Sequence, residues 1–304
     1  MVRLDSSQVV AQPQEVYDKS EALAEQVAGL LGQQRAGLIT DVDGTIAPIV
    51  ERPEEAAVDP LARSSLEQLK GVVPLVAVVS GRRAEDARKM VGIDRLTYVG
   101  NHGLEVWTTD HAEIVAEARP WVPRLAAALA AVEQRVKQPG ILAENKGVTG
   151  SLHYRAADDP EAARAALLEA LATAVPISGL RVEEGRRVLN LLPPLTVTKG
   201  SAVRSLAREH QLQAIVYLGD DLTDAHAFSE LARLRQRGEA TTLSIGVVGP
   251  ETPPRVRQLA DASVPSVACV ASLLCAVATR LSGASGTMAE GGVPTERREH
   301  HGHS

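Results

Sequence analysis

Residues 37–45 read Gly-Leu-Ile-Thr-Asp-Val-Asp-Gly-Thr, and this stretch decides how the rest of the chain is interpreted. An apolar run that ends abruptly in two acids predicts a buried strand with a polar turn at its carboxyl end. Alternate residues of a strand point to the same side, so Asp41 and Asp43 can share one pocket. Gly44 lets the chain turn, and Thr45 adds a hydroxyl and a backbone N–H. Two acids so close are costly unless a cation or a shared proton relieves them, which favours a metal or acid–base site over a solvated Asp-Gly turn.

The composition is that of a soluble globular protein. The chain has 304 residues, of which 44% are hydrophobic and 23% charged. A net charge of −6 and only 2% aromatic residues argue against a nucleic-acid partner, which needs a basic face and stacking platforms. No run of about 18 apolar residues occurs, so no membrane-spanning helix is expected.

The cysteine content and the N-terminal sequence predict a cytoplasmic location. The two cysteines, Cys269 and Cys275, are six positions apart on a predicted helix and do not share a face well, so a disulfide framework is not expected. Residues 1–14 lack the apolar segment of a signal peptide.

From residue 38 onward, short apolar runs alternate with amphipathic stretches. This βα alternation predicts a parallel sheet covered by helices on both faces. The expected strands are residues 38–43, 75–80, 97–101, 214–219 and 242–248. The expected helices are residues 60–70, 83–91, 199–209, 224–234 and 254–260.

The middle of the chain has a different pattern and predicts an inserted second domain. Helices are expected over residues 123–136 and after Asp159-Pro160, and strands over residues 142–155, 180–184 and 187–192. This is an α+β arrangement. The expected division is a helical appendage over 1–36, a core over 37–109 and 195–281, the inserted domain over 110–194 and a disordered tail over 282–304.

Polar residues gather where the predicted strands end, and ligands of open α/β sheets bind at that edge. The second strand ends in Ser80-Gly81-Arg82, whose hydroxyl, flexible backbone and cation would hold an anionic oxygen. The third strand is followed by Asn101 and His102.

The strand over 214–219 is followed by Asp220, Asp221 and Asp224, and Lys199 opens the helix before that strand. Helix capping explains one of these three acids. Three acids at a buried strand end indicate a divalent cation, and an all-oxygen ligand set favours Mg²⁺. Acids for a metal, a lysine for an anion and a spare carboxylate are the parts that phosphoryl transfer requires.

Taken together, these motifs resemble those of the haloacid dehalogenase-like phosphatases. The superfamily's four motifs stand in the same order, as residues 41–45, Ser80, Lys199 and residues 219–224. Further stretches are similar to trehalose-6-phosphate phosphatases, over about residues 36–280. These stretches are residues 46–50 (Ile-Ala-Pro-Ile-Val), 79–82 (Val-Ser-Gly-Arg), 100–105 (Gly-Asn-His-Gly-Leu-Glu), 144–149 (Glu-Asn-Lys-Gly-Val-Thr), 153–155 (His-Tyr-Arg) and 217–221 (Tyr-Leu-Gly-Asp-Asp). The resemblance implies a Rossmann-like core with a parallel sheet and an inserted α+β cap domain.

The resemblance also implies roles for single residues. Asp41 would attack phosphorus and form an aspartyl-phosphate, while Asp43 would protonate the leaving sugar oxygen and then activate water. Ser80 and Lys199 would hold the phosphate, and Thr45 would assist through its hydroxyl.

A magnesium ion would lie between Asp41, the backbone carbonyl of Asp43 and Asp220. Asp221 and Asp224 would orient the metal's waters or the lysine from further out.

The inserted domain would close over a small-molecule sugar phosphate and read the sugar. The candidates for this contact are Glu144, Lys146, His153 and Arg155, with Asn101 and His102 from the core. For His153, packing across the strands is an equally good interpretation.

The sequence departs from the family at one place that bears on the sugar. Asn190 and Leu192 stand where the family usually has Glu and Arg, and Thr198 stands where Asp usually precedes the motif lysine. The expected reaction is Mg²⁺-dependent hydrolysis of trehalose 6-phosphate. The alternatives are a phosphatase for another sugar phosphate, such as sucrose 6-phosphate or a glycosyl-phosphoglycerate, and an inactive sugar-phosphate sensor. The oligomeric state does not follow from the sequence.

Overall fold

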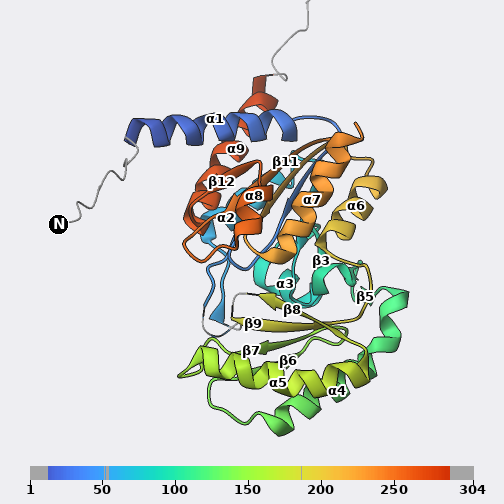
Figure 1. Ribbon diagram of the computed structural model, residues 1–304. Helices are drawn as coiled ribbons and strands as arrows, with labels where there is room; N and C mark the ends of the chain where they lie inside the picture. Colours follow the sequence, from blue (N-terminus) through green and yellow to red (C-terminus); the bar gives the residue numbers. More distant parts are fainter. Residues whose placement is uncertain (1–12, 51, 53–54, 186, 288–304) are drawn as a thin grey trace, which may run out of the picture.

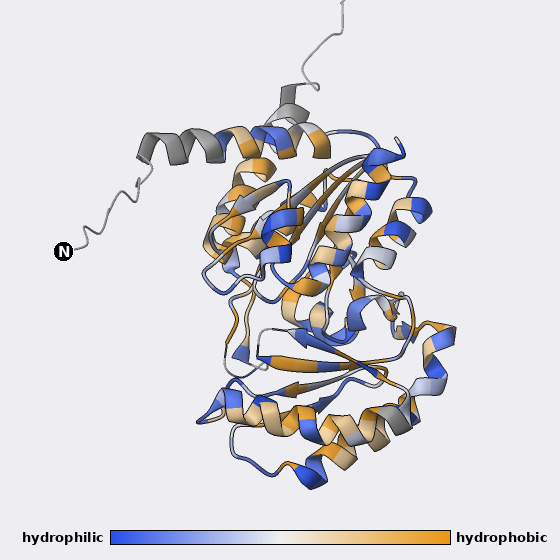
Figure 2. Cartoon of the chain, viewed as in Figure 1, coloured by the Kyte–Doolittle hydropathy of each residue, from blue (hydrophilic) through white to orange (hydrophobic). Residues whose placement is uncertain are grey.

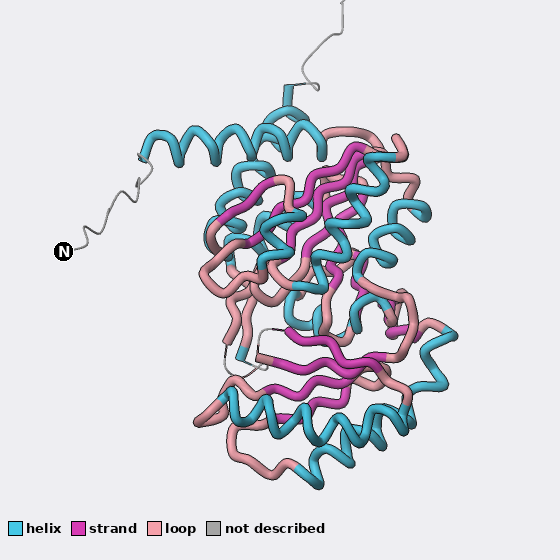
Figure 3. The backbone as a smooth tube through the Cα atoms, in the orientation of Figure 1, coloured by secondary structure: helices cyan, strands magenta, loops and turns pink. Residues whose placement is uncertain are grey.

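The computed structural model contains two β-sheets, each with helices of its own (Figure 1). It describes residues 13–50, 52, 55–185 and 187–287. The smaller sheet and its helices form a separate layer beneath the larger unit in the tube view (Figure 3). None of the helices in this described part has both the length and the apolar character that a bilayer span needs.

The larger sheet has eight strands in the order β12-β11-β10-β1-β2-β3-β4-β5. From β12 to β3 neighbouring strands are parallel, while β4 and β5 continue the sheet in antiparallel pairing. The strands are β1 (Ala36–Thr40), β2 (Leu75–Val79), β3 (Thr97–Gly100), β4 (Glu105–Trp107), β5 (Ala112–Ile114), β10 (Ala214–Gly219), β11 (Thr241–Val247) and β12 (Ala262–Val264). The expected mostly parallel α/β sheet is confirmed.

Helices cover both faces of this sheet because its central strands are apolar on both sides, as their orange colour in Figure 2 shows. Leu38 packs with α1, α2, α3 and α9 on one face, and its neighbour Ile39 packs with α6, α7 and α8 on the other. The helices are α1 (Pro13–Leu31), α2 (Pro60–Leu69), α3 (Ala84–Val91), α6 (Lys199–Glu209), α7 (Leu222–Gln236), α8 (Pro254–Leu259) and α9 (Val267–Thr287).

The smaller sheet is antiparallel, with the order β6-β7-β9-β8. Leu152 on β7 packs against the helices α4 and α5, whereas its neighbours Ser151 and His153 face a pocket toward the larger unit. The sheet comprises β6 (Leu142–Asn145), β7 (Gly150–His153), β8 (Arg181–Gly185) and β9 (Val188–Leu192), covered by α4 (Val122–Arg135) and α5 (Pro160–Ser178). Two short 3-10 helices lie in connections of the chain: η2 (Asn101–Gly103) joins β3 to β4, and η3 (Ala116–Trp121) follows β5 and leads into α4.

Several boundaries differ from those expected. The single strand predicted over residues 142–155 is the β6–β7 hairpin, because residues 146–149 form its turn. The division predicted at residue 110 falls between β4 and β5, which pair within the larger sheet, so we propose that the cap begins after β5. Helix α9 continues to Thr287, past the expected tail boundary at 282, and residues 288–304 lie outside the described residues.

Helix α1 is more than an appendage. The helical segment expected within residues 1–36 contains α1 (Pro13–Leu31), but four residues of this helix are buried in the same apolar cluster as α2 and α9. These residues are Ala24, Val27, Ala28 and Leu31. The N-terminal helix is therefore part of the wall of the core.

Candidate active site

The chain order across the larger sheet creates a switch point beside β1. From β1 the chain proceeds to β2 and β3 on one side, and it returns later as β10 and β11 on the other. Loops diverge at such a point and leave a crevice at the carboxyl ends of the strands. Asp41 follows β1 and Asp220 follows β10, so both acids stand at the mouth of this crevice.

Lys199 is a buried cation that bridges two acids. Its Nζ lies 2.9 Å from Asp41 Oδ1 and 2.7 Å from Asp224 Oδ1. Burial lowers the pKa of the ammonium group, but the charges of Asp224 and Asp41 outweigh burial and hold that pKa well above its ordinary value. Lys199 is therefore firmly cationic at the first turn of α6.

The negative charge of Asp41 is less well compensated than the positive charge of Lys199. Burial raises its pKa well above the ordinary value, and the charges of Asp224, Asp221 and Asp220 raise it further, while Lys199 opposes them in part. One ammonium group among several carboxylates leaves an excess of negative charge in a dry site. When all the acids are ionised, a further cation is needed to neutralise this excess of negative charge.

Asp224 has both carboxylate oxygens engaged within the protein. Its Oδ1 accepts from Lys199 and from the Tyr217 hydroxyl, the latter at 2.6 Å. Its Oδ2 accepts from the backbone N–H groups of Asp220 and Asp221, at 3.0 and 3.1 Å. Burial is the main reason that the pKa of Asp224 is raised to about 6. Asp224 thus shapes the loop after β10 and positions the lysine.

Asp221 and Asp220 differ in their surroundings. Asp221 is the N-cap of α7, with its Oδ1 accepting from the N–H groups of Thr223 and Asp224 at 2.8 and 3.1 Å. Asp220 is only 2% exposed and points toward the turn after β1. A Cβ at Gly44, whose φ is +84°, would lie 2.2 Å from Asp220 Oδ2, so this position has no room for a side chain.

The residues at this edge fit a divalent cation. Asp41, Asp220 and Asp224 each offer a carboxylate oxygen, and these oxygens lie within 4.8 Å of one another. The all-oxygen donor set suits a hard cation. Because Asp224 is already saturated by hydrogen bonds, Asp41 and Asp220 are the better placed to contact an ion directly.

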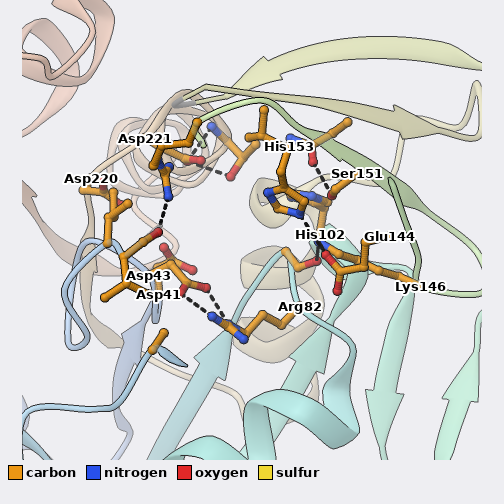
Figure 4. A pocket seen from close by; sticks show the side chains of 18 of the residues that line it. Asp41, Asp43, Arg82, His102, Glu144, Lys146, Ser151, His153, Asp220 and Asp221 are labelled. Carbon is orange, nitrogen blue, oxygen red and sulfur yellow. Dashed lines mark hydrogen bonds and ion pairs between the residues drawn. The ribbon is translucent and has the colours of Figure 1, made fainter. Parts of the chain in front are cut away.

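Asp43 and Arg82 form a bidentate ion pair at the pocket rim (Figure 4). Arg82 Nε donates to Asp43 Oδ2 and Nη2 donates to Oδ1, both at 2.7 Å. Ser80 is 1% exposed, and its Oγ accepts from the Arg82 N–H at 3.2 Å. Thr45 is fully buried, and its hydroxyl has no hydrogen-bond partner among the described residues.

His102 lies in the pocket wall, while Asn101 does not reach the pocket. His102 packs against the backbone of Gly81, where an added Cβ would lie 2.6 Å from the imidazole Cε1. Burial is the main cause that lowers the pKa of His102 to about 3, and Lys199 and Lys146 lower it further. The imidazole is therefore neutral at physiological pH. Asn101 is fully buried and makes its contacts inside the protein.

The smaller sheet brings four of the expected residues to the other side of the pocket. Glu144 Oε2 lies 3.0 Å from His153 Nε2 and 3.5 Å from Lys146 Nζ. Burial raises the pKa of Glu144, but His153 and Lys146 outweigh it and lower the pKa to about 2. Arg155 lines the same pocket and donates to the Val50 carbonyl at 2.6 Å. Figure 4 shows Glu144, Lys146 and His153 opposite the aspartates.

Sequence reasoning missed two kinds of residue. Tyr217, Glu105 and Thr149 form hydrogen bonds behind the pocket, and no local pattern distinguishes them from packing residues. Ser151 lies in the pocket and donates to Asn190 Oδ1 at 2.8 Å. The only signal for Ser151 in the sequence was the alternation of polar and apolar residues around Leu152. This alternation places Ser151 on the same face of the strand as His153.

The fold and the carboxylate site together define a haloacid dehalogenase-like protein. The fold agrees with the C-terminal domain of trehalose-6-phosphate phosphatase from C. albicans, with a TM-score of 0.70, 21% identity and coverage of 88% of this chain and 97% of that one. The trehalose-phosphatase family model matches residues 39–253, so the chain belongs to the trehalose-phosphatase family.

Among curated relatives, trehalose-phosphate phosphatase of Mycobacterium marinum is 32% identical over 241 residues, which is 74% of this chain and 60% of the relative. An uncharacterised glycosyl hydrolase of Mycobacterium tuberculosis is 35% identical over 215 residues, 67% of this chain but only 16% of that protein. The chain thus spans less than two thirds of the length of these relatives.

Proposed function

We propose that the protein is a Mg²⁺-dependent phosphatase that hydrolyses trehalose 6-phosphate to trehalose and phosphate in the cytoplasm. The observation that supports this most directly is the meeting of Asp41, Asp220 and Lys199 at the switch point of the sheet. Membership of the trehalose-phosphatase family and the naming of a relative as trehalose-phosphate phosphatase support the substrate.

In the proposed mechanism Asp41 is the nucleophile and forms an aspartyl-phosphate as the sugar oxygen departs. Asp43 gives its proton to the leaving oxygen and later accepts one from the water that hydrolyses the aspartyl-phosphate. Lys199 and Ser80 position the phosphoryl group. Burial keeps bulk water away from Asp41, which is 4% exposed.

Asp41 and Asp220 would hold the magnesium ion, with Asp224 fixing the loop that carries Asp220. The ion, when bound, would neutralise charge on the phosphoryl oxygens. Glu144, Lys146 and His153 would read the sugar from the smaller sheet, because they line the side of the pocket opposite the aspartates.

A second candidate substrate is another sugar phosphate, such as sucrose 6-phosphate or a glycosyl-phosphoglycerate. The observation that favours it is the amide of Asn190 in the pocket, held by Ser151. The family resemblance implies a carboxylate at this position. An amide and a carboxylate present different donors and acceptors to a sugar hydroxyl.

Phosphate release from a panel of substrates tests both candidates. The panel holds trehalose 6-phosphate, sucrose 6-phosphate, glucose 6-phosphate and a glycosyl-phosphoglycerate, each with Mg²⁺ and with a chelator, and Asp41→Asn serves as the blank. We expect the highest kcat/KM for trehalose 6-phosphate and no release without the metal. A higher kcat/KM for another sugar phosphate would show that this compound, and not trehalose 6-phosphate, is the substrate. A complete lack of turnover would indicate a sensor.

A further inference from the structure

The turn of the β6–β7 hairpin is hydrogen-bonded to the loop that follows β3. Asn101 makes this connection with both atoms of its amide. Its Oδ1 accepts from the Thr149 hydroxyl at 2.5 Å, and its Nδ2 donates to the Lys146 carbonyl at 3.2 Å. Asn101 is fully buried and Thr149 is 1% exposed, so water does not compete for these bonds.

The same amide also bonds back into the larger unit. Asn101 Nδ2 donates to Glu105 Oε2 at 2.6 Å, and this oxygen accepts the Ala84 N–H at 3.2 Å. Ala84 is the first residue of α3 and is separated from the Ser80–Arg82 loop only by the N-cap residue Arg83. One side chain therefore joins the hairpin turn of the smaller sheet to the segment that borders the phosphate side of the pocket.

The backbone around Asn101 is fixed independently of its side chain. The N–H of Asn101 donates to the Arg82 carbonyl at 2.7 Å, and the N–H of His102 donates to the Ser80 carbonyl at 3.0 Å. Asn101 and His102 have φ values of 51° and 60°, in the left-handed region that favours glycine. The conformation can therefore survive a change to glycine, which removes the short side chain and its amide.

The hairpin turn carries a group that faces the pocket. Lys146 Nζ donates to the Gly81 carbonyl at 3.3 Å and lies 3.5 Å from Glu144 Oε2. Val148, two residues further along, is fully buried against Leu104 and Ala118. A shift of this turn would carry Lys146 away from the Ser80–Arg82 loop.

We propose that Asn101 is a positioning residue that locks residues 146–149 onto the larger unit, so that the sugar-side and phosphate-side groups of the pocket form one site. This role replaces the direct substrate contact expected for Asn101 from the sequence, since its side chain is buried behind the pocket wall. The kinetic part of the inference rests on the proposed function; the structural part does not.

Three variants separate the loss of the lock from general damage to the fold. Asn101→Gly removes the amide and keeps the left-handed backbone accessible. Thr149→Val keeps the shape of the side chain but removes the hydroxyl that Asn101 Oδ1 accepts from, while Thr149→Ser retains it. If the lock acts as described, Asn101→Gly and Thr149→Val share one effect, and Thr149→Ser resembles the wild type.

Hydrogen exchange measures the lock without any substrate. We expect the backbone amides of residues 145–150 to exchange about tenfold faster in Asn101→Gly and Thr149→Val. In the wild type, local opening of this turn has to break hydrogen bonds to Asn101, and in the variants some or all of these bonds are already absent. Amides of the Ser80–Arg82 loop should keep their wild-type rates, since their backbone hydrogen bonds remain. Wild-type exchange of residues 145–150 in both variants would overturn the proposal.

Steady-state kinetics then link the lock to the sugar. For trehalose 6-phosphate we expect KM to rise about tenfold or more in both variants, because Lys146 is displaced. For p-nitrophenyl phosphate, which carries no sugar, kcat/KM should stay within about twofold. The double variant should lose no more than Asn101→Gly alone, since that variant already removes the bond to Thr149.

Equal losses on both substrates, or additive losses in the double variant, would overturn the lock. If the wild-type protein hydrolyses p-nitrophenyl phosphate but not trehalose 6-phosphate, the proposed substrate is wrong. The hydrogen-exchange result would still decide the role of Asn101.

Discussion

Arg82 holds both carboxylate oxygens of Asp43 at once, with Nε to Oδ2 and Nη2 to Oδ1 each at 2.7 Å. This bidentate geometry fixes the plane of the carboxylate. Burial lowers the pKa of the guanidinium, but the hydrogen bond and charge of Asp43 raise it overall. With both oxygens engaged, Asp43 must loosen or share this pair before it can give a proton to a leaving oxygen. Arg82 is thus expected to act through Asp43 as well as on the substrate.

Replacement of Arg82 should therefore slow catalysis in a graded way. We expect kcat to fall about tenfold in Arg82→Lys and about a hundredfold in Arg82→Ala, because a misplaced acid–base group is costly. The neighbouring Arg83, whose side chain is 44% exposed and pairs with Glu85, supplies the control. Arg83→Ala should leave kcat unchanged. Wild-type kcat in Arg82→Lys would show that the paired geometry is unimportant.

Asp41→Asn should abolish turnover while leaving the fold intact. The loss in kcat should be about a thousandfold or more, as for other catalytic nucleophiles. The melting temperature should stay the same or rise, because burial and neighbouring acids already raise the pKa of Asp41 and make its ionised form costly. Calorimetry and phosphate release measure the two quantities. A kcat of Asp41→Asn within tenfold of the wild-type value would contradict the assignment of Asp41 as the nucleophile.

Tyr217→Phe removes the hydroxyl that donates to Asp224 Oδ1 at 2.6 Å. We expect stability to fall by about 1 kcal/mol, the usual net worth of one buried hydrogen bond. The rate kcat should fall several-fold as well, because Asp224 positions Lys199. Tyr98→Phe is the matched control, since Tyr98 is equally buried and donates to the Ile93 carbonyl at 2.7 Å. It should lose similar stability and keep kcat.

The buried His102 should make stability depend on pH between about 5 and 6.5. Its pKa is lowered to about 3 in the folded protein, against 6.5 in the unfolded chain, chiefly by burial and then by Lys199 and Lys146. In this window the unfolded chain binds the proton and the folded protein does not, so the free energy of unfolding falls as pH falls.

His102→Asn removes this dependence and tolerates the left-handed backbone. The free energy of unfolding can be measured with urea at pH 5, 6 and 7. Its increase with pH should be smaller in the variant than in the wild type by about 1 kcal/mol per pH unit. His210→Asn, at the exposed end of α6, should retain the wild-type slope. An unchanged slope in His102→Asn would contradict a buried neutral imidazole.

The aspartates of the site could be predicted because the signal is local. Short apolar runs identify the parallel strands, and the carboxyl ends of parallel strands meet at one edge of the sheet. Asp41, Ser80 and Asp220 each follow such a run directly, and the structure brings all three to that edge.

The hydrogen-bond partners of Asp43 and Asn101 could not be predicted, because they come from distant parts of the chain. Arg82 bonds to Asp43, 39 positions earlier, and Thr149 bonds to Asn101, 48 positions earlier. Neither separation corresponds to a helical or strand period. The β4–β5 hairpin was missed for a related reason, since its two strands of three residues are too short for a clear alternation.

Helix α1 has a consequence for how the molecule reaches its final state. Its apolar side chains pack in one cluster with those of α9, and Arg280 of α9 pairs with Glu21 of α1. Helix α1 therefore completes its packing only after α9, which follows it by more than 200 residues in the chain, has been synthesised. During synthesis one face of the sheet stays open until α9 has emerged, and in that interval the nascent chain is most exposed to aggregation.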